Sequence, residues 1–386
     1  MSGPWEEVAL ADLLSVPVTY GIVQPGNNVD DGVPILRVNN LRDGVITAGS
    51  AIRVSPEVAR VYSRTSLRGG EVVVSLVGTV GEAAVVPNEL RGWNVARAVG
   101  VLRPAKVSAT WLCICMQSRP VQRQLRDRVN TTVQTTLNLK DLAAVRIPVP
   151  SEPEQRAIAE LLGALDDKTA ANRLLIAAAD DLRAMRFRAL LGPDAARLSD
   201  LAQFVNGKAF TNGASGTGRV VIRIAELNSG IGGSTVYNDI DVAEDHLARP
   251  GDLLFAWSGS LTVHRWFRQE GIINQHIFKV IPTRDIPVWV VEGALQERLA
   301  EFRSIAADKA TTMGHIQRRH LDERVSVPSP QSIANEHALM QALWNLALAA
   351  ELETLVLSST RDELLPLIMS GKVRVRDVER VVEGVV

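Results

Sequence analysis

The sequence has very few cysteines and no run that could serve as a membrane span. Cys113 and Cys115 are the only cysteines among 386 residues, so a framework of several disulfides is excluded and the reducing cytoplasm is the expected location. The longest apolar segment, residues 338–357, carries two glutamates and a polar face, which argues against a membrane span. Residues 1–7 show no basic stretch followed by an apolar run, so we predict no signal peptide.

The common catalytic motifs are also missing. The sequence contains no G-x-x-x-x-G-K-[ST] phosphate loop, no H-E-x-x-H zinc pair and no G-x-S-x-G nucleophile elbow. No two prolines are adjacent, which excludes the Asp/Asn-Pro-Pro-aromatic motif with which amino-methyltransferases hold a flipped base. We therefore predict that the chain is not an enzyme, that it needs no cofactor, and that it binds neither S-adenosylmethionine nor ATP.

A few short patterns could be sites, but other interpretations compete with each. His315 and His320 are five residues apart rather than four, so they do not share a helix face well and we predict no metal site. Cys113 and Cys115 alternate with apolar residues and would share one face of a strand, where buried cysteines are the better interpretation. Residues 78–81, Gly-Thr-Val-Gly, could form a backbone nest for a phosphate or a simple tight turn.

Two long segments with helical periodicity stand about 180 residues apart, each behind a proline-rich start. The first runs from about Pro148 to Leu191, and the second follows residues 327–330 and ends at 370–371. Apolar residues recur in steps of three and four along both segments, at Ile158, Leu161, Leu165, Leu175 and Leu182, and at Leu339, Leu343, Leu346, Ala350, Leu357 and Leu364. Helices of about 35 residues would be about 50 Å long. We predict that they pack as an antiparallel coiled coil; the alternative is two unrelated amphipathic helices on separate cores.

The segments that precede the helices read as mostly β and match each other in order. Residues 34–38 align with 220–224, residues 67–79 with 247–260, and Asn94 with Asn274. This order implies a tandem duplication of a globular domain followed by a long helix. We therefore predict an α+β fold with two β-rich domains separated by two long helices. The expected divisions are domain 1 at 1–150, spacer helix 1 at 151–192, domain 2 at 193–330, spacer helix 2 at 331–373 and a C-terminal tail at 374–386.

Positive charge is concentrated in one window of a chain whose net charge is only −1. Between residues 91 and 150 there are ten Lys and Arg against two acids, an excess of eight, which is the footprint expected for binding a phosphate backbone. Residues 130–136 add Asn, Thr and Gln side chains suited to phosphates or base edges. A solvated helix face followed by a Thr-rich loop would have the same composition. In the second half the charge is balanced, but five of the six histidines fall between residues 246 and 320.

These features together resemble the specificity subunits of type I restriction-modification systems. The resemblance covers nearly the whole chain and rests on several motifs: Trp5-x-x-Val8-x-Leu10-x-Asp12-Leu13, Tyr20-Gly21-Ile22, Ile35-Leu36-Arg37-Val38, Gly70-Glu71-Val72-Val73-Val74-Ser75, Thr131-Thr132-x-Gln134-x-x-Leu137-Asn138-Leu139, Ile147-Pro148-Val149-Pro150-x-x-x-Glu154-Gln155 and Glu363-Leu364-Leu365-x-x-x-Met369-Ser370-Gly371-Lys372. The second half departs from the pattern. Asn335 stands where the first helix has Gln155, Gly259-Ser260-Leu261 replaces the fuller glycine turn, and Pro366 should kink the second helix or end it near Leu365.

The resemblance implies that each β-rich domain is a target-recognition domain that reads one half of a split site in double-stranded DNA. The long helices would space the two domains and bind two methyltransferase subunits, through which restriction and translocase subunits would join. Such a complex would methylate adenine and restrict foreign DNA in defence against phage. The chain itself would be its non-catalytic cytoplasmic specificity subunit, with no membrane contact.

Candidate DNA contacts are Arg, Lys, His, Asn, Gln, Ser and Thr residues near the matched motifs, because these side chains read base edges or hold phosphates. The candidates are Thr79, Arg97, Thr132, Gln134 and Lys140 in the first domain, and Ser260, His264, Arg265, Asn274, His276 and Arg318 in the second.

Alternatives from other classes make different demands on the sequence. A single-chain nuclease or methyltransferase fused to one recognition domain would need a catalytic domain, for which 386 residues leave no room beside two repeats. A non-catalytic scaffold of two β modules that binds protein or another ligand would not require the basic window at residues 91–146.

Overall fold

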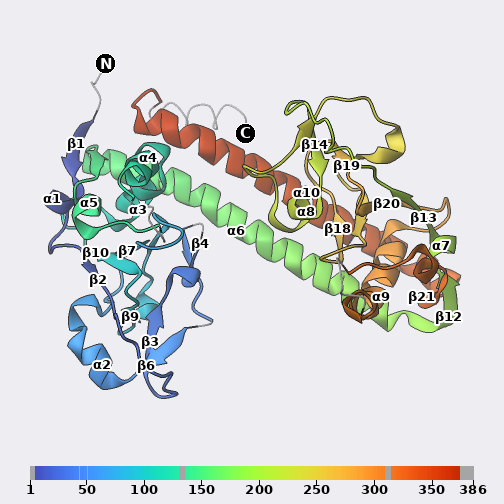
Figure 1. The fold of residues 1–386 in the computed structure, drawn as a ribbon, viewed down its shortest axis with the longest axis horizontal. Coiled ribbons are helices and arrows are strands. Elements are labelled where there is room, and N and C mark those ends of the chain that lie inside the picture. Colours follow the sequence, from blue (N-terminus) through green and yellow to red (C-terminus); the bar gives the residue numbers. More distant parts are fainter. Residues whose placement is uncertain (1–4, 43, 50, 130–134, 309–313, 374–386) are drawn as a thin grey trace. The chain divides into compact units, whose positions relative to one another are not determined.

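The structure is a computed structural model that describes residues 5–42, 44–49, 51–129, 135–308 and 314–373 (Figure 1). The chain divides into two compact units. Unit 1 comprises Met1–Asp166 with Ser359–Val386, and unit 2 comprises Asp167–Ser358. Within the described residues, no helix combines the length and the apolar character that a membrane crossing requires.

Unit 1 is built from short strands and short helices. The strands are β1 Glu6–Ala9, β2 Thr19–Tyr20, β3 Val33–Leu36, β4 Leu41–Arg42, β5 Val45–Ile46, β6 Ile52–Val54, β7 Val72–Ser75, β8 Ala83–Val85, β9 Asn94–Val95, β10 Val99–Leu102 and β11 Arg146–Val149. The helices are α1 Leu10–Leu13, α2 Pro56–Val61, α3 Ala109–Gln117, α4 Arg119–Asp127 and α5 Leu139–Ala143. The strands form sheets in the orders β2-β10-β7-β8 and β6-β3-β9, with two ribbons, β1-β11 and β4-β5.

A helix whose central six residues are buried lies inside the segment predicted to be mostly β. α3 begins after Ser108, whose hydroxyl accepts a hydrogen bond from the N–H of Trp111 at 3.1 Å. Residues 111–116 are all buried, so this helix is apolar on every side and shows no period that a sequence pattern could reveal. Cys113 and Cys115 are therefore on a helix and not on a strand, whereas their predicted burial is confirmed. Burial raises the pKa of the Cys113 thiol to about 12.

Unit 2 has a closely similar set of elements. Its strands are β12 Leu191–Arg197, β13 Ala202–Asn206, β14 Arg219–Ile222, β15 Tyr237–Asn238, β16 Leu247–Ala248, β17 Leu253–Ala256, β18 Thr262–Arg265, β19 Gly271–Ile273, β20 Ile277–Pro282 and β21 Arg324–Pro328. Its short helices are α7 Leu198–Leu201 and α8 Ile224–Ser229, and a longer one is α9 Val288–Asp308. The sheets have the orders β13-β20-β17-β18 and β15-β14-β19-β16, with a ribbon β12-β21.

The main sheets of the two units correspond in strand order, which confirms the predicted duplication, although β16 of unit 2 and the ribbon β4-β5 of unit 1 have no counterpart among the described strands. β2-β10-β7-β8 matches β13-β20-β17-β18, and the parallel pair β3-β9 matches the parallel pair β14-β19. The registers also agree, because Leu36 pairs with Val95 in unit 1 and Ile222 pairs with Ile273 in unit 2. This register makes Ala96, two residues after Asn94, the counterpart of Asn274. The predicted pairing of Asn94 with Asn274 is therefore wrong by two residues.

The two long helices are α6, Glu152–Ala189, and α10, Pro330–Met369 (Figure 1, green and red). In unit 2 they run antiparallel, because Lys168 pairs with Glu353 at 3.1 Å while Arg186, further along α6, pairs with the earlier Glu336 at 3.7 Å. In unit 1, Arg361 of α10 pairs with Asp166 of α6 at 2.9 Å. The predicted antiparallel packing of the helices is confirmed.

The buried stripes of both helices agree with the predicted ones only in part, because Ile158 and Ala350 are buried as predicted but other positions are not. Leu175, Leu182, Leu339 and Leu346 are 38–43% exposed. The buried positions of the second half of α6 and the first half of α10 are instead Asn172, Ala179, Arg183, Phe187, Met340, Trp344 and Ala347. Because several of these side chains are polar or small, a stripe chosen by its leucines follows the wrong face. The helix α10 also continues through Pro366 to Met369, where the neighbouring Leu365 and Ile368 are buried in the core of unit 1.

Candidate nucleic-acid interface

Several turns of unit 1 meet at one end of the sheet β2-β10-β7-β8. The N–H of Leu76, just after β7, donates to the carbonyl of Ala98, just before β10, at 2.8 Å. The N–H of Gly21, just after β2, donates to the carbonyl of Val99 at 3.3 Å. Because antiparallel strands alternate in direction, the end of β2, the start of β10 and the end of β7 lie at one edge. We call this edge the sheet end of unit 1.

Some of the predicted contact residues of domain 1 lie at this sheet end. Thr79 and Arg97 are both exposed there, in the turns after β7 and before β10. The N–H of Gly78 donates to the carbonyl of Thr135 at 3.0 Å, so the chain that follows residues 130–134 is held at the same place. The predicted contacts Thr132 and Gln134 themselves lie outside the described residues.

Lys140 is placed elsewhere. It is exposed on α5 and lines a hollow of about 340 Å³ together with residues of segment 14–18. That segment bonds to the far end of β10, where the N–H of Ser15 donates to the carbonyl of Arg103 at 2.8 Å. The structure therefore separates Lys140 from Thr79 and Arg97.

A basic helix face lies next to the turn after β7. Arg119, Arg123 and Arg126 of α4 are exposed, and their spacing places them along one side of a helix. Within the described part of the chain no ion pair neutralises any of these arginines. The side chain of Gln122 donates to the carbonyl of Gly81 at 2.8 Å, which ties α4 to the β7–β8 turn. This face offers free positive charge beside the sheet end.

Other cations of the basic window are structural. The guanidinium of Arg103 donates to the carbonyls of Arg64 and Ser66, both at 2.9 Å, and it faces Glu71 at 3.5 Å. The guanidinium of Arg146 donates to the carbonyl of Glu7. The charge excess read from the sequence is therefore divided between a free helix face and side chains that hold the fold.

Unit 2 brings the equivalent turns together at the equivalent end of its sheet. The N–H of Trp257 donates to the carbonyl of His276 at 3.2 Å, and the N–H of Gly207 donates to the carbonyl of Ile277 at 3.0 Å. The N–H of Gly259 donates to the carbonyl of Gly314 at 2.8 Å, as Gly78 does to Thr135 in unit 1. Three predicted contacts, Ser260, Asn274 and His276, fall in these turns. We call this edge the sheet end of unit 2.

The sheet end of unit 2 also holds an aromatic cluster that the motifs did not indicate. The ring of Trp257 lies 5.7 Å from the ring of His276 and 6.2 Å from that of His315, measured between centroids. The indole N–H of Trp257 donates to Oδ1 of Asn206 at 2.8 Å. A further missed residue, the exposed Lys208, forms an isolated bridge with Asn274. The only sequence signal for Trp257 was its position just before the Ser-Gly-Ser turn.

Arg265 has a structural role, contrary to the prediction that it contacts DNA. It is 9% exposed, and its guanidinium donates to Glu351 at 2.7 Å and to Asp180 at 3.2 Å. The same guanidinium and that of Arg183 each lie 4.8 Å from the ring of Trp344. Because its guanidinium nitrogens bond to carboxylates of the two long helices, Arg265 fastens β18 to those helices.

Two other predicted contacts lie away from the turns. His264 is half-buried on β18, and burial, assisted by the nearby charge of Arg268, lowers the pKa of its imidazole. Arg318 is exposed and donates to the carbonyl of Phe204 on β13 at 3.1 Å. Its neighbour His320 is buried and accepts a hydrogen bond from the N–H of Gln317 at 3.1 Å. Within the described residues, no cluster of three or more His, Cys, Asp or Glu side chains could hold a metal ion.

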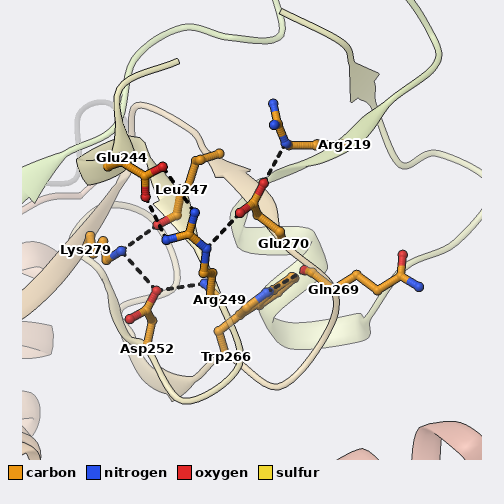
Figure 2. A network of polar contacts seen from close by, with 9 residues as sticks. All are labelled: Arg219, Glu244, Leu247, Arg249, Asp252, Trp266, Gln269, Glu270 and Lys279. Carbon is orange, nitrogen blue, oxygen red and sulfur yellow. Dashed lines mark hydrogen bonds and ion pairs between the residues drawn. The ribbon is translucent and has the colours of Figure 1, made fainter. Parts of the chain in front are cut away.

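A second group of cations in unit 2 is neutralised by acids (Figure 2). Arg249 donates to Glu244 at 2.7 Å and to Glu270 at 2.8 Å, and Glu270 also accepts from Arg219 at 2.7 Å. The hydrogen bonds from Arg249 to Glu244 and Glu270 raise the pKa of its guanidinium. These charges compensate one another and link β14, β16 and the loop before β19. They do not form a free positive surface.

A search of solved structures finds proteins with a similar fold. The crystal structure of a type I restriction-modification system S subunit from M. genitalium has a similar fold, with a TM-score of 0.60 over 94% of this chain and 96% of that chain. The sequence identity is 14%, so this likeness concerns the fold alone. The chain therefore shares its fold with that S subunit.

Two sequence comparisons, with a family model and with a curated protein, also find similarity. Residues 3–178 match the family model described as "Type I restriction modification DNA specificity domain", so slightly less than half of the chain is similar to that family. The specificity subunit of the type I restriction enzyme EcoBI of Escherichia coli is 30% identical over 210 residues. That match covers 53% of this chain and 41% of the relative, so the chain spans less than half of the length of this curated relative.

Proposed function

We propose that the chain is the DNA specificity subunit of a type I restriction-modification complex and that each unit reads one half of a bipartite site. The observation that carries this proposal is the repeated sheet end. Both units bring the same turns to the same edge, but the side chains there differ. A shared scaffold with different exposed turns is what two readers of different half-sites require.

The chemistry of the two sheet ends suits duplex DNA. In unit 1 the exposed Arg97 and Thr79 can reach base edges or phosphates, and the free arginines of α4 can neutralise phosphates beside them. In unit 2 the same position carries Asn274, His276 and the exposed Lys208. Thr132 and Gln134, which lie outside the described residues, remain proposed contacts of unit 1.

The chain is proposed to be non-catalytic, without a bound cofactor, and to act in the cytoplasm. Adenine methylation would be carried out by two methyltransferase subunits, with restriction and translocase subunits joining through them. Exposed apolar side chains on the long helices support docking of such partners: Leu174 is 74% exposed, Met185 66% and Val356 64%. Burial of these side chains by a partner subunit would remove their apolar surface from water, which favours binding. The division into recognition domains 1–150 and 193–330 and spacer helices remains part of this proposal.

Sequencing of methylated bases in genomic DNA tests the proposal. Cells that carry the chain with its neighbouring methyltransferase should show methylated adenines in a two-part motif with a fixed gap, and deletion of the chain should abolish that methylation. A motif that persists without the chain, or direct assays in which the purified complex shows no preference among duplexes, would contradict it.

A further inference from the structure

A hollow at the sheet end of unit 2 is lined by both apolar and polar residues. Its volume is about 200 Å³, and it is lined by Arg223, Ile224, Ala225, Asn274, His276 and Ile277. Asn274 is only 7% exposed and Ile277 is fully buried. Ala225 is exposed and His276 is half-buried, so the outer side of the hollow is accessible. The hollow adjoins the turn that carries the proposed DNA contacts.

Two polar atoms in the walls of this hollow lack partners. Oδ1 of Asn274 and Nδ1 of His276 are both buried, and neither has a hydrogen-bond partner among the described residues. Buried polar atoms in folded proteins are nearly always hydrogen-bonded. An amide oxygen can only accept a hydrogen bond. A ligand that presents an N–H or O–H donor would therefore supply the hydrogen bond that Oδ1 of Asn274 lacks.

The neighbouring arginine does not convert the hollow into an anion site. The guanidinium of Arg223 donates to both carboxylate oxygens of Glu226, at 2.7 Å and 3.0 Å, and to the carbonyl of Ser234 at 2.7 Å. Its charge is thus balanced by a buried carboxylate. A phosphate in the hollow would face Arg223, whose charge Glu226 already balances, and Oδ1 of Asn274, which cannot donate a hydrogen bond. The hollow is therefore unsuited to an anion.

Unit 1 has no such polar groups at the equivalent positions. The N–H of Ala96 donates to the carbonyl of Leu36 at 2.8 Å, as the N–H of Asn274 donates to that of Ile222 at 3.1 Å. The carbonyl of Ala98 likewise corresponds to that of His276, since each accepts from the residue after β7 or β17. Alanine therefore occupies both positions in unit 1. The side-chain acceptor Oδ1 of Asn274 is therefore present at the sheet end of unit 2 and has no equivalent at that position in unit 1.

We infer that Asn274 is a specificity-determining residue whose Oδ1 accepts a hydrogen bond from the exocyclic amino group of a base, adenine N6 or cytosine N4, in the half-site read by unit 2. This inference rests on the proposed function. Among the major-groove edges only adenine and cytosine present an amino donor, which matches an unpaired amide oxygen. His276 lies beside Asn274, and its Nδ1 can contact the same base or the adjacent one.

The first test is the methylation motif of cells that carry Asn274→Ala. Alanine is the residue of unit 1 at this position, so the scaffold accommodates it. The expected result is that one position in one half of the motif, an adenine or a cytosine or its complement, becomes degenerate, while the gap and the other half are unchanged. Asn238→Ala is the matched control, because Asn238 is also buried with an unpaired Oδ1 but lies on β15 outside the hollow. It should leave the motif unchanged.

The second test removes the amino group instead of the side chain. The purified complex is titrated with duplexes in which each adenine of the half-site is replaced by purine, or each cytosine by pyrimidinone, one position at a time. Wild type should lose about tenfold in affinity at one position, as expected for leaving a buried acceptor unpaired. Asn274→Ala should show no further loss at that position. The base that gives the effect identifies the amino group as adenine N6 or cytosine N4.

The outcomes separate this inference from the proposed function. If wild type itself produces no gapped motif, the proposed function fails. If wild type produces the motif and Asn274→Ala produces the same motif at every position, the inference alone is wrong. A loss of all methylation by Asn274→Ala also contradicts it if the variant still binds the methyltransferase subunits, because a single missing base contact should relax one position and not abolish recognition.

Discussion

At the scale of single residues, the arginines of this chain differ in role according to their partners. Arg97 is exposed in a turn, whereas Arg265 is buried between Asp180 and Glu351. We predict that Arg265→Ala lowers the free energy of unfolding by about 3 kcal/mol, because it leaves the largely buried carboxylate of Glu351 without its cation, whereas Asp180 keeps Arg183. Denaturant titration followed by circular dichroism measures this. Arg97→Ala, as the control, should change stability by less than about 0.5 kcal/mol while weakening DNA binding; equal stability losses in both variants would contradict the assignment.

His264 gives the fold a dependence on pH. Burial and the charge of Arg268 hold the pKa of its imidazole below the ordinary value of 6.5, so the unfolded chain takes up the proton first as pH falls. The contribution of neutral His264 to stability is therefore fully present above pH 6.5 and is lost as pH falls through and below that value. Urea titrations between about pH 8 and pH 5 should show a smaller acid loss for His264→Gln than for wild type. Identical pH profiles would disprove this.

The residues found and missed at the sheet ends show what the sequence reveals at this scale. Thr79 and Ser260 were placed at the sheet ends because they belong to turns that repeat between the two halves, whereas Asn274 was selected through a pairing with Asn94 that is wrong by two residues. Trp257 was missed because a tryptophan after an apolar strand is indistinguishable from a core residue until the register places His276 and His315 against it. Arg265 was misassigned because its partners, Asp180 and Glu351, are 85 and 86 residues distant.

At the scale of elements, α4 carries exposed positive charge, and the turns carry the polar side chains that we propose read the bases. We predict that the triple change Arg119→Ala, Arg123→Ala and Arg126→Ala reduces the slope of log affinity against log salt concentration by about 2 to 3, since each phosphate that a cation neutralises contributes about 0.9 to that slope. The methylation motif should stay the same. Fluorescence anisotropy with a labelled duplex at several salt concentrations measures the slope.

The control for that experiment is Arg249→Ala, since this cation is already paired with Glu244 and Glu270 (Figure 2). It should leave the salt slope unchanged. A slope that falls equally in both variants would mean that total charge, and not the face of α4, governs binding to DNA.

A helix could be predicted from the sequence where its apolar residues recur with a helical period. The two long helices were predicted within a few residues of α6 and α10, because their length and proline-rich starts are local properties. Their buried stripes were predicted only in part, since packing of Asn172, Arg183 and Trp344 depends on partners from other elements. The helix α3 was missed because a helix that is apolar on all sides has no amphipathic period.

At the scale of the whole molecule, the duplication predicts independent half-sites. Replacement of residues 1–150 by the corresponding segment of another specificity subunit should change one half of the methylated motif and leave the other half and the gap as they are. Single-molecule sequencing of genomic DNA from cells with the chimaera reads both halves at once. The reciprocal chimaera, with residues 193–330 replaced, is the control and should change the other half. A change in both halves from either exchange would contradict independent reading.

The sequence by itself determined the duplication, the β-rich character of each domain and the two long helices, because repeated motif order and helical periodicity are properties of the linear chain. Only the tertiary structure decided which side chains meet at each sheet end and which arginines remain free. Those properties depend on strand register, which brings Trp257 to His276 and Arg265 to Glu351 across distant segments. Arg265 stabilises the fold because tertiary structure places Glu351 within hydrogen-bond distance. Oδ1 of Asn274 is the proposed base contact because the fold leaves it without a partner.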